Sequence, residues 1–149
     1  IVPQHCTDFA MANTSHTNLQ YAIFCTQFAE EHGHVSILGI LDAVDVQGTI
    51  KRGQPTPRKV FPITLVLGII CAEGDHRLML EITRPVGGIV TTMDLESFTI
   101  SPGEAYHRCV ATLDMETPED GTYTFEILLD DTRIGHAQLP VTFVIEYES

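Results

Sequence analysis

Residues 122–130 read TYTFEILLD, and this stretch decides the fold class. Its apolar side chains recur at every second position, at Tyr123, Phe125, Ile127 and Leu129, with Thr124 and Glu126 between them. Side chains of a β-strand point alternately to its two faces, so a period of two predicts a strand with one face in a hydrophobic core. The stretch therefore predicts β-structure and not an amphipathic helix.

The same period recurs on both sides of this stretch. Residues 77–84 place Leu78, Leu80 and Ile82 on one face, and residues 141–146 do the same with Val141, Phe143 and Ile145. We expect these two segments and residues 122–130 to contribute to one shared core. Residues 60–71 are apolar on nearly every position, which predicts a central strand that is covered on both faces.

Further strands are expected at residues 19–26, 35–46 and 108–113. The first should direct one row of side chains inward, namely Leu19, Tyr21, Ile23 and Cys25, and the second is either long or broken, with Gly39 marking a bulge. Residues 28–32 could form one helical turn at most. Clusters of Gly, Pro and Asp separate the segments, so the sequence predicts a single antiparallel β-sandwich of seven to nine strands, all-β and immunoglobulin-like or C2-like.

Length and charge limit the remaining possibilities. The chain has 149 residues, with 8 basic and 20 acidic ones and a net charge of −12, which suits one domain at residues 19–147 after a flexible N-terminal extension at residues 1–18. Met11 resembles an ordinary bacterial start, and no basic residue precedes Lys51, so we expect no secretory signal and a cytoplasmic protein. The acidity argues against nucleic acid and anionic membranes as partners, and the apolar runs are too short to span a bilayer.

The cysteines are spaced too irregularly for a zinc ribbon. Cys25, Cys71 and Cys109 each lie in an apolar strand pattern, and we expect them to be small buried side chains. A Cys25–Cys71 disulfide or a reactive thiol is the alternative.

Five short segments, in their order along the chain, resemble a bacterial family of small β-sandwich proteins of unknown function. They are Phe24-Cys25, Val35–Ile40, Phe61-Pro62, Gly74–Leu78 and Gly121–Phe125. The resemblance covers roughly residues 19 to 145 and implies a fold but no activity.

Histidines and turn acids are the candidate metal ligands. His32 and His34 would lie on the same side of an extended segment and could chelate a metal, with His76 or His107 as a third ligand. The turn acids could cluster at one end of the sandwich and bind calcium, although the spacing of a calcium loop is absent: Asp42, Asp45, Asp75, Asp130 and Asp131. A polar turn and solvated acids explain the same residues without a metal.

No catalytic motif is present, and the aromatic residues Tyr21, Tyr123, Phe125 and Phe143 all fall on expected core faces, which argues against a sugar-binding platform. A basic, proline-containing loop at residues 51–59 carries half of the basic residues of the chain, namely Lys51, Arg52, Arg58 and Lys59. These four could dock an acidic protein surface or keep a connection solvated. We therefore expect a non-catalytic module without a cofactor that binds a protein partner or itself. The alternative is a metal-binding module or hydrolase that uses His32, His34 and the turn acids.

Overall fold

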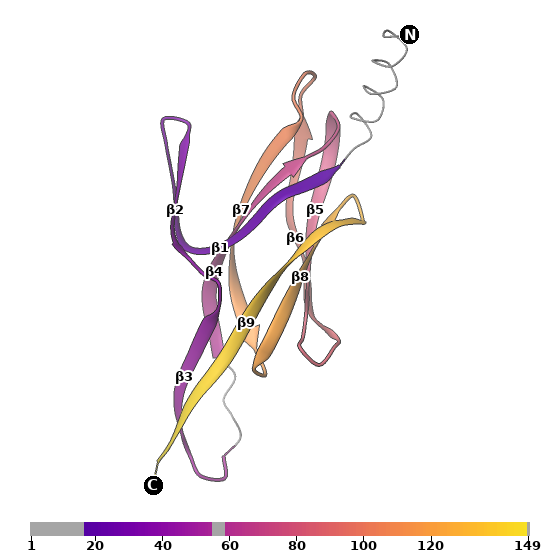
Figure 1. Cartoon of the computed structure of the whole chain (residues 1–149). Helices are drawn as coiled ribbons and strands as arrows, with labels where there is room; N and C mark the ends of the chain where they lie inside the picture. Colours follow the sequence, from indigo (N-terminus) through magenta and orange to yellow (C-terminus); the bar gives the residue numbers. More distant parts are fainter. Residues whose placement is uncertain (1–16, 55–58, 149) are drawn as a thin grey trace, which may run out of the picture.

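The computed structural model describes residues 17–54 and 59–148, which form nine strands in two packed sheets (Figure 1). The all-β sandwich expected from the sequence is confirmed. In chain order the strands are β1 (Asn18–Glu31), β2 (His34–Ile40), β3 (Val44–Lys51), β4 (Lys59–Ile70), β5 (Gly74–Thr83), β6 (Ile89–Ile100), β7 (Tyr106–Thr117), β8 (Gly121–Leu129) and β9 (Thr132–Glu148). One sheet has the order β2-β1-β4-β7 and the other β3-β9-β8-β5-β6.

The core lies between the two sheets and uses the residues that the alternation indicated. The inward side chains of β5 and β8, together with Val141 of β9, are buried in one hydrophobic cluster. Phe143 is half-buried and packs against this cluster, whereas Ile145 is half-buried and lies outside it. The expected core is therefore confirmed except at the end of β9, where β3 is the paired neighbour. The central position of β4 is also confirmed, since β1 and β7 flank it and Val66 is fully buried on its outer face.

The sandwich is not wholly antiparallel. The chain leaves the first sheet after β2, crosses at residues 41–43 and enters the second sheet as β3, which runs parallel to the last half of β9. The segment expected at residues 35–46 is therefore two strands in different sheets. Gly39, with a φ of 66°, precedes the break.

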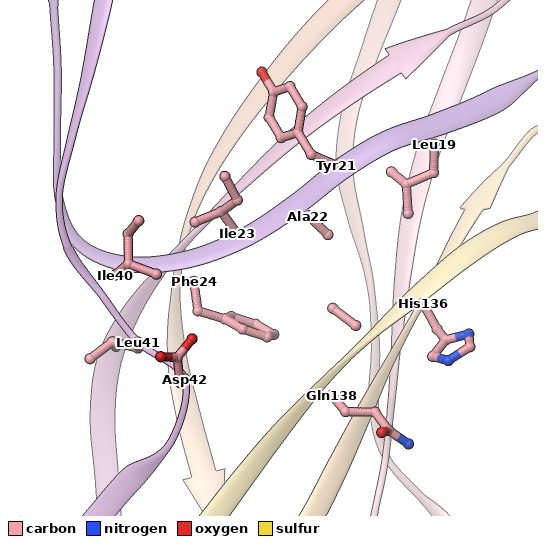
Figure 2. Close-up of a pocket in the computed structure, with 11 residues that line it drawn as sticks. Leu19, Tyr21, Ala22, Ile23, Phe24, Ile40, Leu41, Asp42, His136 and Gln138 are labelled. Carbon is pink, nitrogen blue, oxygen red and sulfur yellow. The ribbon is translucent and has the colours of Figure 1, made fainter.

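The side chains of β1 that face the core differ from those expected. A register shift between Leu19 and Tyr21 places Leu19, Ala22 and Phe24 against the core and turns Tyr21, Ile23 and Cys25 to the outer face. Figure 2 shows this division, with Tyr21 and Ile23 on one side of β1 and Leu19, Ala22 and Phe24 on the other. A strict period of two could not reveal the shift, because one extra residue moves every preceding side chain to the opposite face.

Two hairpins close with two-residue turns in the left-handed region. His32 and Gly33 join β1 to β2 with φ values of 52° and 77°, and Asp130 and Asp131 join β8 to β9 with φ values of 51° and 66°. Positive φ at both central residues matches the twist of paired strands, and Gly and Asp tolerate it. Residues 28–31 continue β1 and His32 lies in the turn, so the one helical turn that residues 28–32 could have formed does not occur.

The strands span residues 18 to 148, one residue beyond each end of the expected domain. Residues 1–16 lie outside the described residues, so the flexible N-terminal extension stays a prediction. Over residues 17–54 and 59–148 there is no helix that is long and apolar enough to cross a membrane.

Candidate functional site

Two strand segments on the same side of the sandwich have a paired neighbour on one edge only, and together they form what we call the β1–β9 seam. Residues 18–24 of β1 pair with β4, and residues 132–140 of β9 pair with β8. β2 joins β1 from Cys25 onward, and β3 joins β9 from Val141 onward. Among the described strands, none pairs with the second edge of either segment.

The hydrogen bonds show which backbone groups of β9 face this open edge. The N–H of Asp130 donates to Arg77 O of β5, so even-numbered residues of β8 face β5 and odd-numbered ones face β9. Because Phe125 lies opposite Ala137, the backbone of Ala137 is directed to β8. His136 and Gln138 therefore direct their N–H and C=O groups to the open edge.

Backbone groups of β1 face the open edge as well. Leu41 N donates to Phe24 O over 2.8 Å, which shows that Phe24 directs its backbone away from β4. Alternate residues of a strand direct their backbone groups to the same edge, so the N–H and C=O of Ala22 also face the seam. Backbone donors and acceptors thus border the seam from both sheets.

A hollow of about 510 Å³ lies in the seam (Figure 2). Leu19 covers Gly135 and closes one end, so that even a methyl group on Gly135 would lie 2.6 Å from the Leu19 side chain. The floor holds two alanines, Ala22 and Ala137, which leave more space than the larger inward residues Phe24 and Leu139 of the same strands. The remaining lining residues are Tyr21, Ile23, Phe24, Ile40, Leu41, Asp42, His136 and Gln138.

The chemistry of this hollow suits an extended chain. Within residues 17–54 and 59–148, it combines an apolar floor with backbone groups on both edges and one carboxylate, that of Asp42, and no Lys or Arg there is among its lining residues. An added strand uses backbone hydrogen bonds for affinity and side-chain pockets for specificity. Sequence reasoning missed this site, although Pro140 was a signal, since a proline inside a sheet indicates an edge strand whose nitrogen faces away from the ladder.

The predicted metal ligands do not lie as expected. His32 is in the left-handed turn, so the segment from His32 to His34 is not extended, and the His32 side chain is 86% exposed next to Glu31. The turn acids are divided, with Asp42 at the seam and Asp75 and Asp130 at a second hollow. No group of three or more His, Cys, Asp or Glu side chains suited to a metal occurs within the described part of the chain.

The basic loop is placed only in part. Lys51 ends β3, and Arg52 lies in the turn that follows, with both side chains exposed. Lys59 begins β4, and Arg58 falls outside the described residues. Docking by these four residues therefore stays a prediction.

A second hollow, of about 460 Å³, adjoins His76, which sequence analysis considered only as a third metal ligand and whose side chain is 11% exposed. His76 Nδ1 lies 2.6 Å from Asp130 Oδ2, and His76 Nε2 lies 2.6 Å from Ala72 O. Both partners accept hydrogen bonds, so both ring nitrogens donate, which requires the imidazolium form. Burial opposes that charge, but the bonds to Ala72 and Asp130 outweigh it and raise the pKa of His76.

The same contacts act on Asp130. Burial would raise the pKa of Asp130, but the hydrogen bonds from His76 and from Arg77 N–H hold this pKa below its ordinary value. Phe98 lies between His76 and His107 and stacks on His107 with ring centroids 3.8 Å apart, and His107 Nε2 contacts Glu96 Oε1. The cluster of charged groups and aromatic rings thus joins β5 and β6 of the second sheet to β7 of the first, and we interpret it as structural.

The cysteines are buried as expected. Cys25, Cys71 and Cys109 are free and at most 2% exposed. Burial, with a smaller contribution from the charge of Glu96, raises the pKa of Cys109 to about 12. A thiol with so high a pKa is a poor nucleophile at neutral pH.

One aromatic residue lies on an unexpected face. Tyr21 lies across Gly68 on the outer face of the first sheet, and its hydroxyl is 2.6 Å from that of Tyr106. Burial and this hydrogen bond raise the pKa of Tyr21 to about 12. The expectation that Tyr21 points into the core is therefore wrong, while Tyr123 and Phe125 are fully buried.

Two solved structures resemble this fold. The Pseudomonas fluorescens alkylpurine DNA glycosylase AlkC, bound to DNA containing an abasic site analogue, matches with a TM-score of 0.57 and 11% sequence identity over 86% of this chain. The match spans 31% of the glycosylase, so this chain corresponds to about a third of its length. An immunoglobulin-like protein from Pseudomonas aeruginosa matches with a TM-score of 0.43 and 12% identity, over 86% of this chain and 98% of that protein.

At such low sequence identity, the two likenesses concern the fold alone. No curated protein matches the chain by sequence. A family match is found over residues 20–142, which include most of β1 and the open part of β9 and agree with the resemblance noted in the sequence. The chain belongs to DUF6941, a family of unknown function.

Proposed function

We propose that this protein is a non-catalytic module that binds another protein. The observation that supports the proposal is the β1–β9 seam, where two facing strand edges that no other described strand pairs with border a hollow. An open strand edge is a template for pairing with another chain, and natural sheets usually cover or blunt such edges. An edge that flanks a hollow of ligand-binding size offers both backbone and side-chain contacts.

The chemistry of the lining residues supports binding over catalysis. Covalent catalysis needs a nucleophile within hydrogen-bond reach of a base, and no Ser, Thr, Cys or Lys of the described residues lines the hollow. The net charge of −12 favours a protein over DNA as the partner, because DNA binding requires local positive charge. We therefore do not propose DNA as a ligand of this chain, although the similar glycosylase structure contains DNA. Three free buried thiols suit a reducing compartment, and we place the protein in the cytoplasm.

A footprint with a native partner tests the proposal. The full chain would be used to capture partners from its source cells, and hydrogen exchange would then be measured with and without the recovered protein. We expect slower exchange within residues 18–24 and 132–140. A partner that protects other surfaces and leaves both segments unchanged would contradict the proposal.

The basic loop supplies a second contact in this proposal, and it is tested separately. Lys51, Arg52, Arg58 and Lys59 would each be replaced with Ser. We expect slower association with the recovered partner at low salt and little change at high salt, because a positive patch steers an acidic surface. Unchanged association at low salt would limit the loop to a solvated connection.

A further inference from the structure

The backbone at the seam restricts the shape of an occupant. Ala22 from β1 and His136 and Gln138 from β9 direct N–H and C=O groups toward it, in alternation with residues that bond the neighbouring strands. A ligand that satisfies such a row must itself present donors and acceptors at the spacing of a strand, as an extended peptide does. A compact small molecule would leave part of the row unpaired.

The floor restricts the side chain that enters. Ala22 and Ala137 leave space in a region where neighbouring strand residues fill the core, and Leu19 closes the end at Gly135. Phe24 and Leu41, which pack in or against the hydrophobic core, border the inner side of the hollow, so we expect the side chain that enters there to be apolar. One aliphatic side chain pointing inward fits this arrangement, while the residues before and after it point to solvent.

The negative charge at the seam and on the whole chain favours a basic partner over a second copy of this chain as the occupant. Asp42 borders the hollow, and no described basic residue pairs with it. The chain as a whole carries a net charge of −12, so two copies repel each other. A segment with Lys or Arg beside its aliphatic residue would place a positive charge next to Asp42 and enter an attractive field.

We propose that the β1–β9 seam binds an extended basic segment of a partner protein, a proposal that rests on the proposed function. The segment adds as a strand to the edge formed by His136 and Gln138, seats one aliphatic side chain over Ala22 and Ala137, and directs a Lys or Arg to Asp42.

Peptide selection tests this proposal without knowledge of the natural partner. A phage-displayed library of random peptides would be selected on the full chain at low salt. We expect enriched sequences that place Lys or Arg near Val, Ile or Leu and that lack Pro at the paired positions. Enriched sequences without basic residues, or no enrichment, would overturn the proposal.

Substitutions in the seam then test the mode of binding with one enriched peptide. Ala137→Leu fills the hollow and should weaken binding about tenfold or more, whereas Ala29→Leu, on the exposed hairpin, should leave it unchanged. Asp42→Asn should weaken binding about two- to fivefold at low salt only, with the exposed Asp114→Asn as its control. Equal affinities for Ala137→Leu and Ala29→Leu would overturn the proposal.

Amide exchange of the peptide complex tests strand addition itself. Binding should slow exchange at His136 and Gln138, and binding without that protection would contradict strand addition.

A concentration-dependent dimer that Ala137→Leu abolishes would identify a second copy as the occupant and overturn the proposal. If the native partner protects the seam but basic peptides do not bind, the partner chemistry fails and the proposed function stands. If the native footprint lies elsewhere, the proposed function fails.

Discussion

The centre of the sandwich and the β1–β9 seam are both formed by strands that direct one face to the core, yet only the centre is closed. At the centre, Tyr123 and Phe125 of β8 are fully buried, and each strand is paired on both edges. At the seam, two alanines border a hollow of about 510 Å³, and each strand segment is paired on one edge. The comparison shows that side-chain volume and strand pairing, which the period of two does not specify, decide where a sandwich remains open.

The largest expected effect is the loss of an aromatic ring from the centre. Phe125 packs edge-to-face on Phe24 with ring centroids 4.8 Å apart. Phe125→Ala should lower the free energy of unfolding by about 3–5 kcal/mol, because it leaves a closed cavity. Leu41→Ala, at the border of the open hollow, should cost about 1 kcal/mol, since water already reaches this region. Urea unfolding of both variants checks the difference, and equal losses would contradict the contrast between centre and seam.

Enlarging an alanine gives the next largest effect. Ala111 lies on the core face of β7 and packs against the hydrophobic cluster, whereas Ala137 lines the hollow. Ala111→Leu should destabilise the fold by about 1–3 kcal/mol through overpacking. Ala137→Leu should change the free energy of unfolding by less than about 0.5 kcal/mol, because space is available. A larger loss for Ala137→Leu than for Ala111→Leu in thermal unfolding would mean that the seam is already filled.

The His76–Asp130 pair should have a smaller effect on the free energy of unfolding, and this effect should depend on pH. The raised pKa of His76 contributes stability that is complete below the ordinary histidine pKa and is lost as the pH rises through the raised value. The urea midpoint should therefore fall as the pH is increased from 6. The lowered pKa of Asp130 acts in the opposite direction, since its contribution is lost as the pH falls through that lowered value.

Asp130→Asn keeps a residue that tolerates the left-handed turn, removes the charge and should cost about 1 kcal/mol at pH 6. It should also flatten the loss of stability above pH 6. Asp42→Asn at the seam should have no measurable effect on unfolding, because no described basic residue pairs with it. A pH dependence that persists in Asp130→Asn would contradict the role of the His76–Asp130 pair.

Much of the fold could be predicted from the sequence because burial imposes a period that is visible residue by residue. The core faces of β5 and β8 and the central position of β4 follow directly from that period. The faces of β1 could not be predicted, since the register shift between Leu19 and Tyr21 depends on pairing with β4. The parallel pairing of β3 with β9 joins residues almost 100 positions apart and carries no local signal.

The candidate site was less predictable than the fold. His32 and His34 drew attention as residue types, but the turn at His32 and Gly33 separates their directions. The seam depends on missing neighbours and on small side chains, and alanine carries no chemical signature. Pro140 was the one local indication that part of β9 lies at an edge.

The most direct test of the open seam is the exchange rate of single backbone amides along β9, measured by NMR on the full chain without a partner. We predict a strict alternation, with fast exchange at His136 and Gln138, whose N–H groups face the seam, and slow exchange at Ala137 and Leu139, which face β8. Protection at His136 and Gln138 equal to that at Ala137 and Leu139 would show that the edge is already paired, and would contradict the account.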